Sequence, residues 1–501
     1  MPSMGIKSSL AKYYAAFLIN KLRKAVSFPE KSQDKVFNQL IASGRKTKFG
    51  KDHQFDKIEN YSDFKNQVPL TDYEGLKPYI EEIKEGKLDI LWPGRPIYFC
   101  KTSGTTSGAK YIPISKESIH NHIHSAKLAL MSYVHETGKS EFIDGKMIFL
   151  QGSPVLDTSG KIPTGRLSGI VAHHVPAYLM KNRMPTMETN SIEDWEQKVD
   201  SIVLETSSAD MRLISGIPSW VQMYFERLIE NTEKVNIKSI FPNFSLFVYG
   251  GVNYEPYRPI FEKLIGDQVP SVETYPASEG FIAFQDSQKE KGLLLVVNDG
   301  IFYEFIPVEE AHNENPTRIP LQDVELDKNY AIVLNTNAGL WGYVIGDLVK
   351  FVSLEPYRII VSGRIKHFTS AFGEHVIAEE VEAALQVGLS NSNAQIKEFH
   401  VAPQVNPESG LPYHEWFIEF VTEPKDLESF VQDIDQELQN KNPYYKDLIQ
   451  GNILRKLVIT KIKPNGFVEF MKSRGKLGGQ NKIPRLSDDR TNAKELEGYA
   501  I

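Results

Sequence analysis

Apolar residues recur at helical spacing in three stretches, which predict helices over 8–26, 31–44 and 115–136. The first stretch belongs to a segment, residues 1–29, that contains lysines and an arginine but no acid. Such a segment is either a targeting or membrane-surface helix or a first helix that packs on the domain. We favour the packed helix.

Strand patterns alternate with helical patterns from residue 95 to residue 285. Strands ended by turn residues are indicated within 95–115, 146–154, 244–251 and 271–285, and residues 212–230 read as a strand followed by a helix. This alternation predicts an α/β fold with a largely parallel sheet. From 292 to 361 short strands follow one another, which indicates an antiparallel layer or a small distorted barrel.

The pattern changes near residue 362, where a helix, two strands, a helix and a strand follow in turn. We therefore expect two domains. Residues 1–361 form a large N-terminal domain with parallel and mixed sheets and the barrel-like layer. Residues 362–501 form a smaller α+β C-terminal domain. A flexible joint is predicted at 362–366.

Composition narrows the possible functions. The chain has 57 basic and 64 acidic side chains and a formal charge of −7, which disfavours nucleic acid as a partner. Its one cysteine, Cys100, excludes an intrachain disulfide and reads as a buried strand residue. No apolar run approaches membrane-spanning length, and we expect a cytoplasmic protein. The oligomeric state stays open.

The segment Thr102–Lys110, TSGTTSGAK, concentrates serine, threonine and glycine and ends in a lysine. Hydroxyl and backbone N–H groups bind anionic oxygens, and glycines let the backbone come close. The spacing differs from that of a Walker A loop. The segment is either a phosphate-binding loop or an ordinary polar turn. We favour the phosphate-binding loop.

Two later segments carry complementary groups. Tyr275–Gly280, YPASEG, offers an aromatic ring for a nucleobase, a hydroxyl for a phosphate and a carboxylate for Mg²⁺. Gly342–Asp347 ends with an acid that can accept hydrogen bonds from ribose hydroxyls. Taken alone, each segment also fits a packing, surface or turn role.

The three segments occur in order and together resemble the signature motifs of the acyl-adenylate-forming superfamily. The chain most resembles its Gretchen-Hagen-type acyl-acid amido synthetase family, the auxin-responsive family. Residues 473–486, SRGKLGGQNKIPRL, resemble that family's closing motif, so the resemblance covers nearly the whole chain. It implies ATP-dependent activation of a carboxylic acid to an acyl-adenylate. Transfer to the amine of an amino acid then gives an amide conjugate and AMP.

The resemblance also implies a role for each matching residue. The residues expected to contact ATP are Ser103, Thr105, Thr106, Lys110, Gly250, Gly251, Tyr275, Ser278, Asp347 and Arg364. The hydroxyl groups would hold phosphates, and Lys110 adds a cation beside them. Tyr275 and the two glycines would lie near the adenine. Asp347 would bind the ribose, and Arg364 at the joint would reach the ribose or a phosphate.

Two residues are implied in catalysis. Glu279 would help to place Mg²⁺, and Lys482 would be brought to the reacting groups by the mobile small domain. The reaction needs the carboxylate aligned with the α-phosphorus and cations facing the developing charge. It also needs water excluded, which a mobile lid domain provides.

Other polar residues are weaker candidates. His120 and His124 share a helical face, but no third metal ligand is evident. His173 and His174 either line an acyl pocket or serve a loop or core, and we favour the second. The acidic run at 425–437 reads as a solvated helix face.

Two other functions remain open. An adenylating enzyme with coenzyme A as acceptor would share the first half-reaction. A non-catalytic binding protein, such as a nucleic-acid-associated regulator, is disfavoured by the charge of −7 and by the presence of Glu279, Asp347 and Lys482 together.

Overall fold

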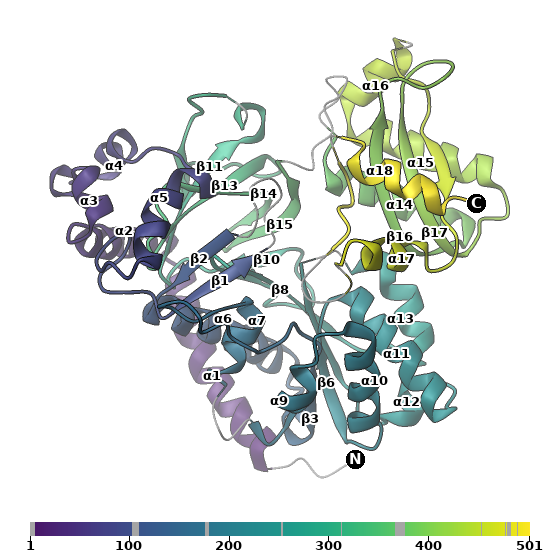
Figure 1. The fold of residues 1–501 in the computed structure, drawn as a ribbon, viewed down its shortest axis with the longest axis horizontal. Coiled ribbons are helices and arrows are strands. Elements are labelled where there is room, and N and C mark those ends of the chain that lie inside the picture. The colour runs from purple at the N-terminus through teal and green to yellow at the C-terminus, as the bar shows by residue number, and fades with distance from the viewer. Residues whose placement is uncertain are drawn as a thin grey trace. The chain divides into compact units, whose positions relative to one another are not determined.

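The structure is a computed structural model in which the chain forms two compact units (Figure 1). Each unit is described by itself. The first unit comprises Met1–Val252, Ile265–Ile345 and Val349–Ile360, and the second comprises Asn253–Leu264, Gly346–Leu348 and Val361–Ile501. The residues that the structure describes are 6–102, 110–175, 180–251, 254–311, 313–365, 376–451, 453–475, 477, 482–487 and 489–501.

Three long helices of the first unit confirm the helical periodicity. They are α1 (Ile6–Val26), α2 (Pro29–Gly44) and α6 (Lys116–Thr137). Helix α1 packs against α6, and its buried side chains are Ala15, Leu18, Ile19 and Leu22. The prediction that the first helix packs on the domain is therefore confirmed for this face.

Shorter helices surround the sheets of the first unit. They are α3 (Lys48–Asp52), α4 (Tyr61–Gln67), α5 (Tyr73–Lys84), α7 (Leu167–Ala172), α9 (Met187–Asn190), α10 (Trp195–Thr206), α11 (Pro218–Thr232) and α12 (Ile237–Ile240). Side-chain oxygens of Asn60, Asp72 and Asp194 accept hydrogen bonds from first-turn N–H groups of α4, α5 and α10. These caps satisfy donors that a helix start leaves unpaired, so the local sequence fixes where these helices begin.

The main sheet has the strand order β12-β11-β13-β14-β15-β10-β9-β8-β7-β6-β3-β5 (Figure 1). Its strands are β3 (Lys146–Phe149), β5 (Arg183–Met184), β6 (Met211–Ser215), β7 (Leu246–Gly250), β8 (Ser271–Ala277), β9 (Gly280–Phe284), β10 (Leu293–Leu295), β11 (Ile301–Pro307), β12 (Ile319–Pro320), β13 (Asn329–Thr336), β14 (Tyr343–Leu354) and β15 (Tyr357–Arg364). Strands β5, β3, β6, β7 and β8 pair in parallel, as the alternating pattern predicts.

The strand run after residue 292 continues this sheet as its mixed, mainly antiparallel half. Strand β9 pairs antiparallel with β8 and β10, and β11 pairs antiparallel with β12 and β13. The described strands run from an edge at β12 to an edge at β5 without closing into a barrel. The predicted layer is therefore part of the α/β sheet.

A second, small sheet has the order β2-β1-β4 and holds β1 (Tyr98–Thr102), β2 (Lys110–Ile114) and β4 (Thr164–Gly165). The sequence pattern predicts both strands of the β1–β2 hairpin but not their separation from the main sheet. That separation depends on side-chain burial, since Phe99, Cys100, Ile112 and Ile114 enter a core cluster with α2 and α5.

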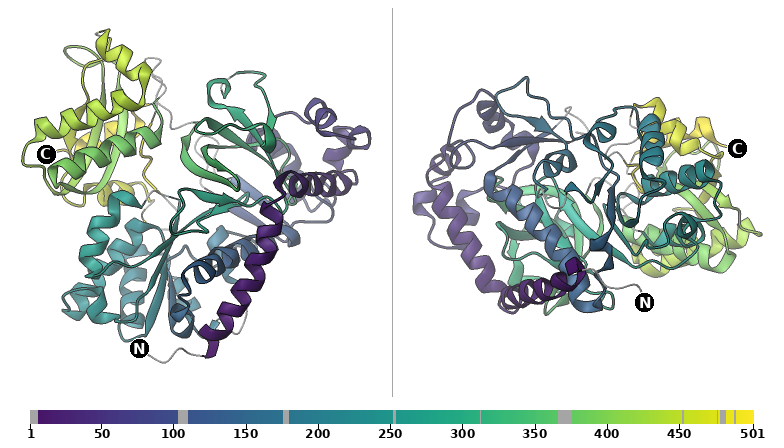
Figure 2. Two further views of the ribbon diagram at one scale, coloured as in Figure 1. Left: turned by 180° about the vertical axis from the view of Figure 1, so that it is seen from behind. Right: turned by 90° about the horizontal axis from the view of Figure 1, so that it is seen from below.

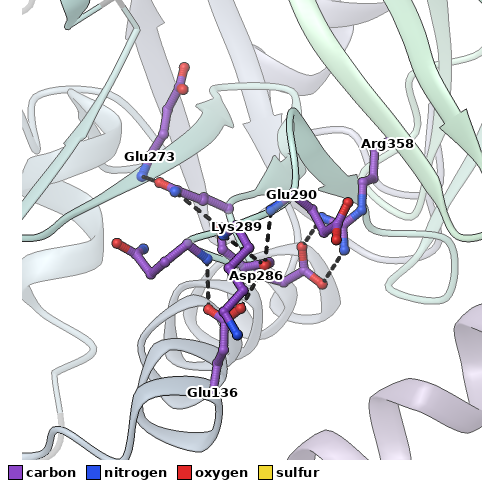
Figure 3. A network of polar contacts seen from close by, with 9 residues as sticks. Glu136, Glu273, Asp286, Lys289, Glu290 and Arg358 are labelled. Atoms are coloured by element: carbon purple, nitrogen blue, oxygen red, sulfur yellow. Dashed lines mark hydrogen bonds and ion pairs between the residues drawn. The ribbon is translucent and has the colours of Figure 1, made fainter.

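A polar network ties the end of α6 to residues 285–290 and β15 (Figure 3). The carboxylate of Glu136 accepts hydrogen bonds from Ser287 Oγ and Gln288 N, both at 2.6 Å. Asp286 forms a two-pronged ion pair with Arg358, whose side chain is 8% exposed. Burial raises the pKa of Asp286, and Arg358 opposes that rise.

The second unit confirms the predicted α+β order. Its sheet has the order β16-β17-β18, formed by β16 (Gln395–Gln404), β17 (Tyr413–Thr422) and β18 (Val458–Lys461). Its helices are α14 (Ala378–Ser392), α15 (Leu427–Lys441), α16 (Pro443–Gln450), α17 (Gly466–Ser473) and α18 (Thr491–Leu496), and α13 (Arg258–Ile265) lies mainly in this unit. A buried cluster that includes Phe399, Trp416 and Phe430 forms its core.

Candidate active site

The described ends of the first segment form an antiparallel hairpin, in which Thr102 of β1 pairs with Lys110 of β2. Lys110 is half-buried, and its ammonium lies 5.8 Å from the centre of the Tyr73 ring. The predicted phosphate ligands Ser103, Thr105 and Thr106 lie outside the described residues, so their roles stay predictions.

The second segment forms a tight turn between β8 and β9. Ser278 and Glu279 occupy the turn, and both are half-buried. Tyr275 pairs with Ala283 across the two strands and is buried in the core of the sheet. The turn therefore holds a hydroxyl and a carboxylate where β8 ends and β9 begins, while the tyrosine side chain is buried in the core.

The strand that leads into the first segment contacts the second segment in the first unit. Cys100 Sγ donates a hydrogen bond to Ser278 Oγ at 3.1 Å, and Cys100 lies two residues before Thr102. The cysteine is fully buried, as predicted. Burial raises the pKa of its thiol to about 12, with the charge of Glu279 adding to the rise and Ser278 opposing it. At neutral pH the thiol is therefore protonated, which suits a packing residue and not a nucleophile.

The Gly250–Gly251 turn lies beside the second segment, since Gly250 ends β7 and pairs in parallel with Thr274 of β8. A Cβ atom at Gly250 would lie 2.3 Å from the carbonyl oxygen of Thr274, and Gly251 has a φ of +79°. Both positions therefore require glycine. The backbone at Gly250 therefore lies close to that of Thr274, the residue before Tyr275, and the role of the two glycines beside a nucleotide stays a prediction.

Two neighbouring cations, Arg166 and Lys198, were not predicted from the sequence. The charge of Arg166 acts on both Cys100 and Lys198. Lys198 is 2% exposed and donates hydrogen bonds to the carbonyl oxygens of Asn190 at 2.6 Å and Gln151 at 3.0 Å. Burial lowers its pKa to about 8. The sequence carries no signal for this burial, because Lys198 lies in the ordinary amphipathic pattern of α10.

Asp347 and Arg364 come together in the second unit. Arg364 Nε lies 2.7 Å from Asp347 Oδ1, with the aspartate side chain largely buried and the arginine half-exposed. Gly346 has a φ of +92°, and its carbonyl oxygen accepts a hydrogen bond from Ile365 N. Asp347, expected at the ribose, and Arg364, expected at the ribose or a phosphate, thus form one charged pair between β14 and the last residue of β15.

Lys482 lies within electrostatic range of this pair. Lys482 is exposed at the surface, and partial desolvation by neighbouring protein atoms lowers the pKa of its ammonium to about 8. Asp347 opposes the shift, and Arg364 and Arg485 add to it. Three residues that the sequence predicts separately, Asp347, Arg364 and Lys482, are therefore neighbours in the second unit.

Arg485 is a further residue that the prediction missed. It forms a 2.7 Å ion pair with Glu398 and donates a hydrogen bond to the hydroxyl of Tyr257. Burial alone would lower its pKa, but Glu398 and Tyr257 raise it. Hydrogen bonds of Val401 with Arg485 and Ser487 hold the following backbone along β16. Arg485 thereby fixes the segment that follows Lys482, and its place in the closing motif was the available signal.

The weaker candidates have ordinary partners. His120 and His124 stack on one face of α6, and His124 Nδ1 lies 2.6 Å from Asp299. Within the described ranges no group of three possible metal ligands occurs. His173 bonds to the carbonyl oxygen of Pro154, and His174 bonds to the hydroxyl of Tyr98.

The prediction of a solvated acidic face at 425–437 is wrong for one residue. Asp435 of α15 is 1% exposed and accepts a hydrogen bond from the hydroxyl of Tyr445 at 2.8 Å and another from Leu457 N. Those partners come from later elements, so the helix pattern alone did not reveal them.

Among the described residues, no helix is long and apolar enough to cross a membrane.

Comparison with solved structures shows the fold class. The fold matches a GH3.15 acyl acid amido synthetase with a TM-score of 0.79 and 17% identity over 96% of both chains. It matches 2-hydroxyisobutyryl-CoA ligase, in its postadenylation state with 2-HIB-AMP, with a TM-score of 0.59 and 14% identity over 96% of this chain and 92% of that chain. The chain thus shares the fold of these two proteins.

Sequence comparison narrows the class to a family. The chain is 22% identical to indole-3-acetic acid-amido synthetase GH3.3 of Arabidopsis thaliana over 93% of this chain and 90% of that protein. It is 23% identical to jasmonoyl–L-amino acid synthetase JAR4 of Nicotiana attenuata over 64% of this chain and 66% of that protein, just under two thirds of the relative's length.

Family models match three successive segments. They describe the GH3 family N-terminal domain at residues 18–201, the central domain at 294–364 and the C-terminal domain at 379–491. The chain belongs to the GH3 family, which confirms the resemblance inferred from the motifs.

Proposed function

We propose that this protein activates a carboxylic acid with ATP to an enzyme-bound acyl-adenylate and transfers the acyl group to the amine of an amino acid. The observation that carries the proposal is the hydrogen bond between Cys100 and Ser278, because it holds the strand that leads into the first segment beside the turn of the second segment. Membership of the GH3 family supports both half-reactions. The identities of the acid and the amino acid remain open.

ATP and Mg²⁺ fit the groups at this place. The half-buried carboxylate of Glu279 and the hydroxyl of Ser278 share one turn, and both are oxygen donors. Mg²⁺ favours one or two carboxylates together with water and substrate phosphates, so this small donor set suffices. We assign Glu279 to Mg²⁺, Ser278 to the α-phosphate and the 102–110 loop, with Lys110, to the other phosphates.

The proposed chemistry proceeds in two displacements. A carboxylate oxygen of the acid attacks the α-phosphorus, and pyrophosphate leaves. The amine then attacks the carbonyl carbon, AMP leaves, and the amine loses a proton. Neither step needs covalent attachment to the protein, so the residues act by alignment and charge stabilisation.

The second unit would supply the remaining charges. We assign Asp347 and Arg364 to the ribose and Lys482 to the negative charge that grows at the α-phosphate.

We also propose domains at 1–361 and 362–501 with a joint near 362–366, supported by the change of pattern there. Limited proteolysis should cut near the joint, and a non-hydrolysable ATP analogue should change the cutting rate. Identical cutting with and without the analogue would contradict a moving lid.

A cytoplasmic location stays a prediction.

Pyrophosphate release tests the activity. A panel of carboxylic acids is supplied with ATP and Mg²⁺, alone and with amino acids or coenzyme A, and the products are identified by mass spectrometry. Amide formation supports the proposal, whereas a thioester would establish coenzyme A as the acceptor. Glu279→Gln should reduce release at least about a hundredfold, while Glu59→Gln, an exposed control, should not. Binding of ATP without release on any acid would favour a non-catalytic protein.

A further inference from the structure

Helix α1 has two apolar faces, and only one of them is packed. While Ala15, Leu18, Ile19 and Leu22 are buried against the first unit, the opposite face exposes Leu10, Tyr13, Tyr14 and Phe17. Their exposed fractions are 64%, 80%, 44% and 68%, so most of this apolar surface is in contact with water. The helix lies along the outside of its unit in both views of Figure 2, and α6 covers its inner side.

The exposed positions follow helical spacing. Residues 10, 13, 14 and 17 are separated by three or four positions, which places them on one stripe of the helix. We call these four side chains the α1 patch. A contiguous apolar patch of this kind on a surface indicates an interaction site.

The charges that flank the patch are all positive. Lys7 lies before it, Lys21 and Lys24 lie after it on the same side, and all three are exposed. Within the part of the chain that the structure describes, none of the three has an ion-pair partner. From the neighbouring α6, Lys127 places its ammonium 5.8 Å from the centre of the Tyr14 ring. Residues 1–29 contain no Asp or Glu, although the whole chain carries a charge of −7.

The combination of apolar side chains and flanking lysines indicates which kind of surface binds the α1 patch. Aromatic and aliphatic side chains flanked by lysines lie in the headgroup region of a bilayer, where the rings reach the acyl boundary and the ammonium groups bind anionic headgroups. A second copy of the chain fits less well. A two-fold contact through this face would bring one set of lysines against the other.

We propose that the α1 patch and its lysines dock the protein on an anionic lipid surface. The helix lies in the plane of the interface and remains packed on α6 through its other face. The attachment is reversible, because one short amphipathic face inserts few side chains. This docking is independent of the activity proposed above, and its failure would leave that activity untouched.

Co-sedimentation of the full chain with vesicles tests the docking. One set of vesicles is pure phosphatidylcholine, and the other contains phosphatidylglycerol at about a third of the lipid. We expect binding to the anionic vesicles that falls steeply as salt is raised. Tyr13→Ser with Phe17→Ser should weaken binding about tenfold, and Lys21→Gln with Lys24→Gln should weaken it by about fivefold per lysine.

Matched controls separate docking from loss of structure. Leu204→Ser removes another apolar side chain, 70% exposed on α10, and Lys46→Gln removes another exposed lysine. Both should bind as the unchanged protein does, and all variants should keep its helical circular dichroism spectrum and melting temperature. Absence of binding to anionic vesicles would overturn the proposal, as would equal binding to neutral vesicles. A concentration-dependent dimer that Tyr13→Ser and Phe17→Ser dissolve would instead assign the patch to a second copy.

Discussion

Lys482 offers a sharp test of the proposed active site: if its ammonium stabilises the transition state of adenylation, its pKa makes the rate depend on pH in a defined direction. The pKa is lowered to about 8, so the ammonium is present below that pH and is lost above it. About nine in ten Lys482 side chains are therefore charged at pH 7 and about one in ten at pH 9. If only the charged form stabilises the transition state, adenylation falls about tenfold over this range.

Two substitutions distinguish the effect of the positive charge of Lys482 from the effect of its side-chain shape. Lys482→Ala removes the ammonium and should slow adenylation about a hundred- to a thousandfold at pH 7, with ATP affinity nearly unchanged. Lys482→Arg keeps a cation that stays charged to pH 9 and beyond, so its slower rate should not decline between pH 7 and pH 9. Lys425→Ala removes an exposed lysine of the same unit and should leave the rate unchanged.

The assay is pyrophosphate release at saturating ATP and acid, with ATP affinity measured separately by calorimetry. A decline with pH that persists in Lys482→Arg would assign the titration to another group. Release by Lys482→Ala at the unsubstituted rate would make Lys482 a surface residue. If the alanine variant still forms amide normally from supplied acyl-adenylate, the lysine acts in the first half-reaction alone.

Three other substitutions have defined outcomes. Arg358→Met should lower the free energy of unfolding by about 3 kcal/mol in urea, because it leaves Asp286 buried without its cation; an unchanged midpoint would contradict this. Burial lowers the pKa of His122 to about 4, so stability should fall by up to about 3 kcal/mol as pH drops from 6.5 to 4. His122→Leu should flatten that slope, and equal slopes would refute the assignment. Cys100→Ala should keep adenylation within about threefold, and native Cys100 should resist iodoacetamide at pH 8; rapid alkylation or loss of adenylation would show a reactive thiol.

The sequence by itself determined the elements and the family. The helical spacing of apolar residues predicted the bounds of α1, α2 and α6 to within about two residues. This spacing is visible in the sequence because one face of each helix is buried and therefore apolar. The alternation of strands and helices found the parallel half of the sheet. The motif residues from Thr102 to Lys482 could be chosen as candidates because their types and order are local properties of the chain, and their roles stay predictions.

Only the tertiary structure decided which residues meet. No local pattern joins Cys100 to Ser278 or Arg485 to Glu398, because each pair is distant in sequence and is brought together by packing. Burial of Lys198 and Asp435 likewise depends on partners from other elements, so their helices read as ordinary surfaces. A pKa near 8 for Lys482 follows from the same cause. Desolvation and charge act through space, and the sequence records only the order of residues along the chain.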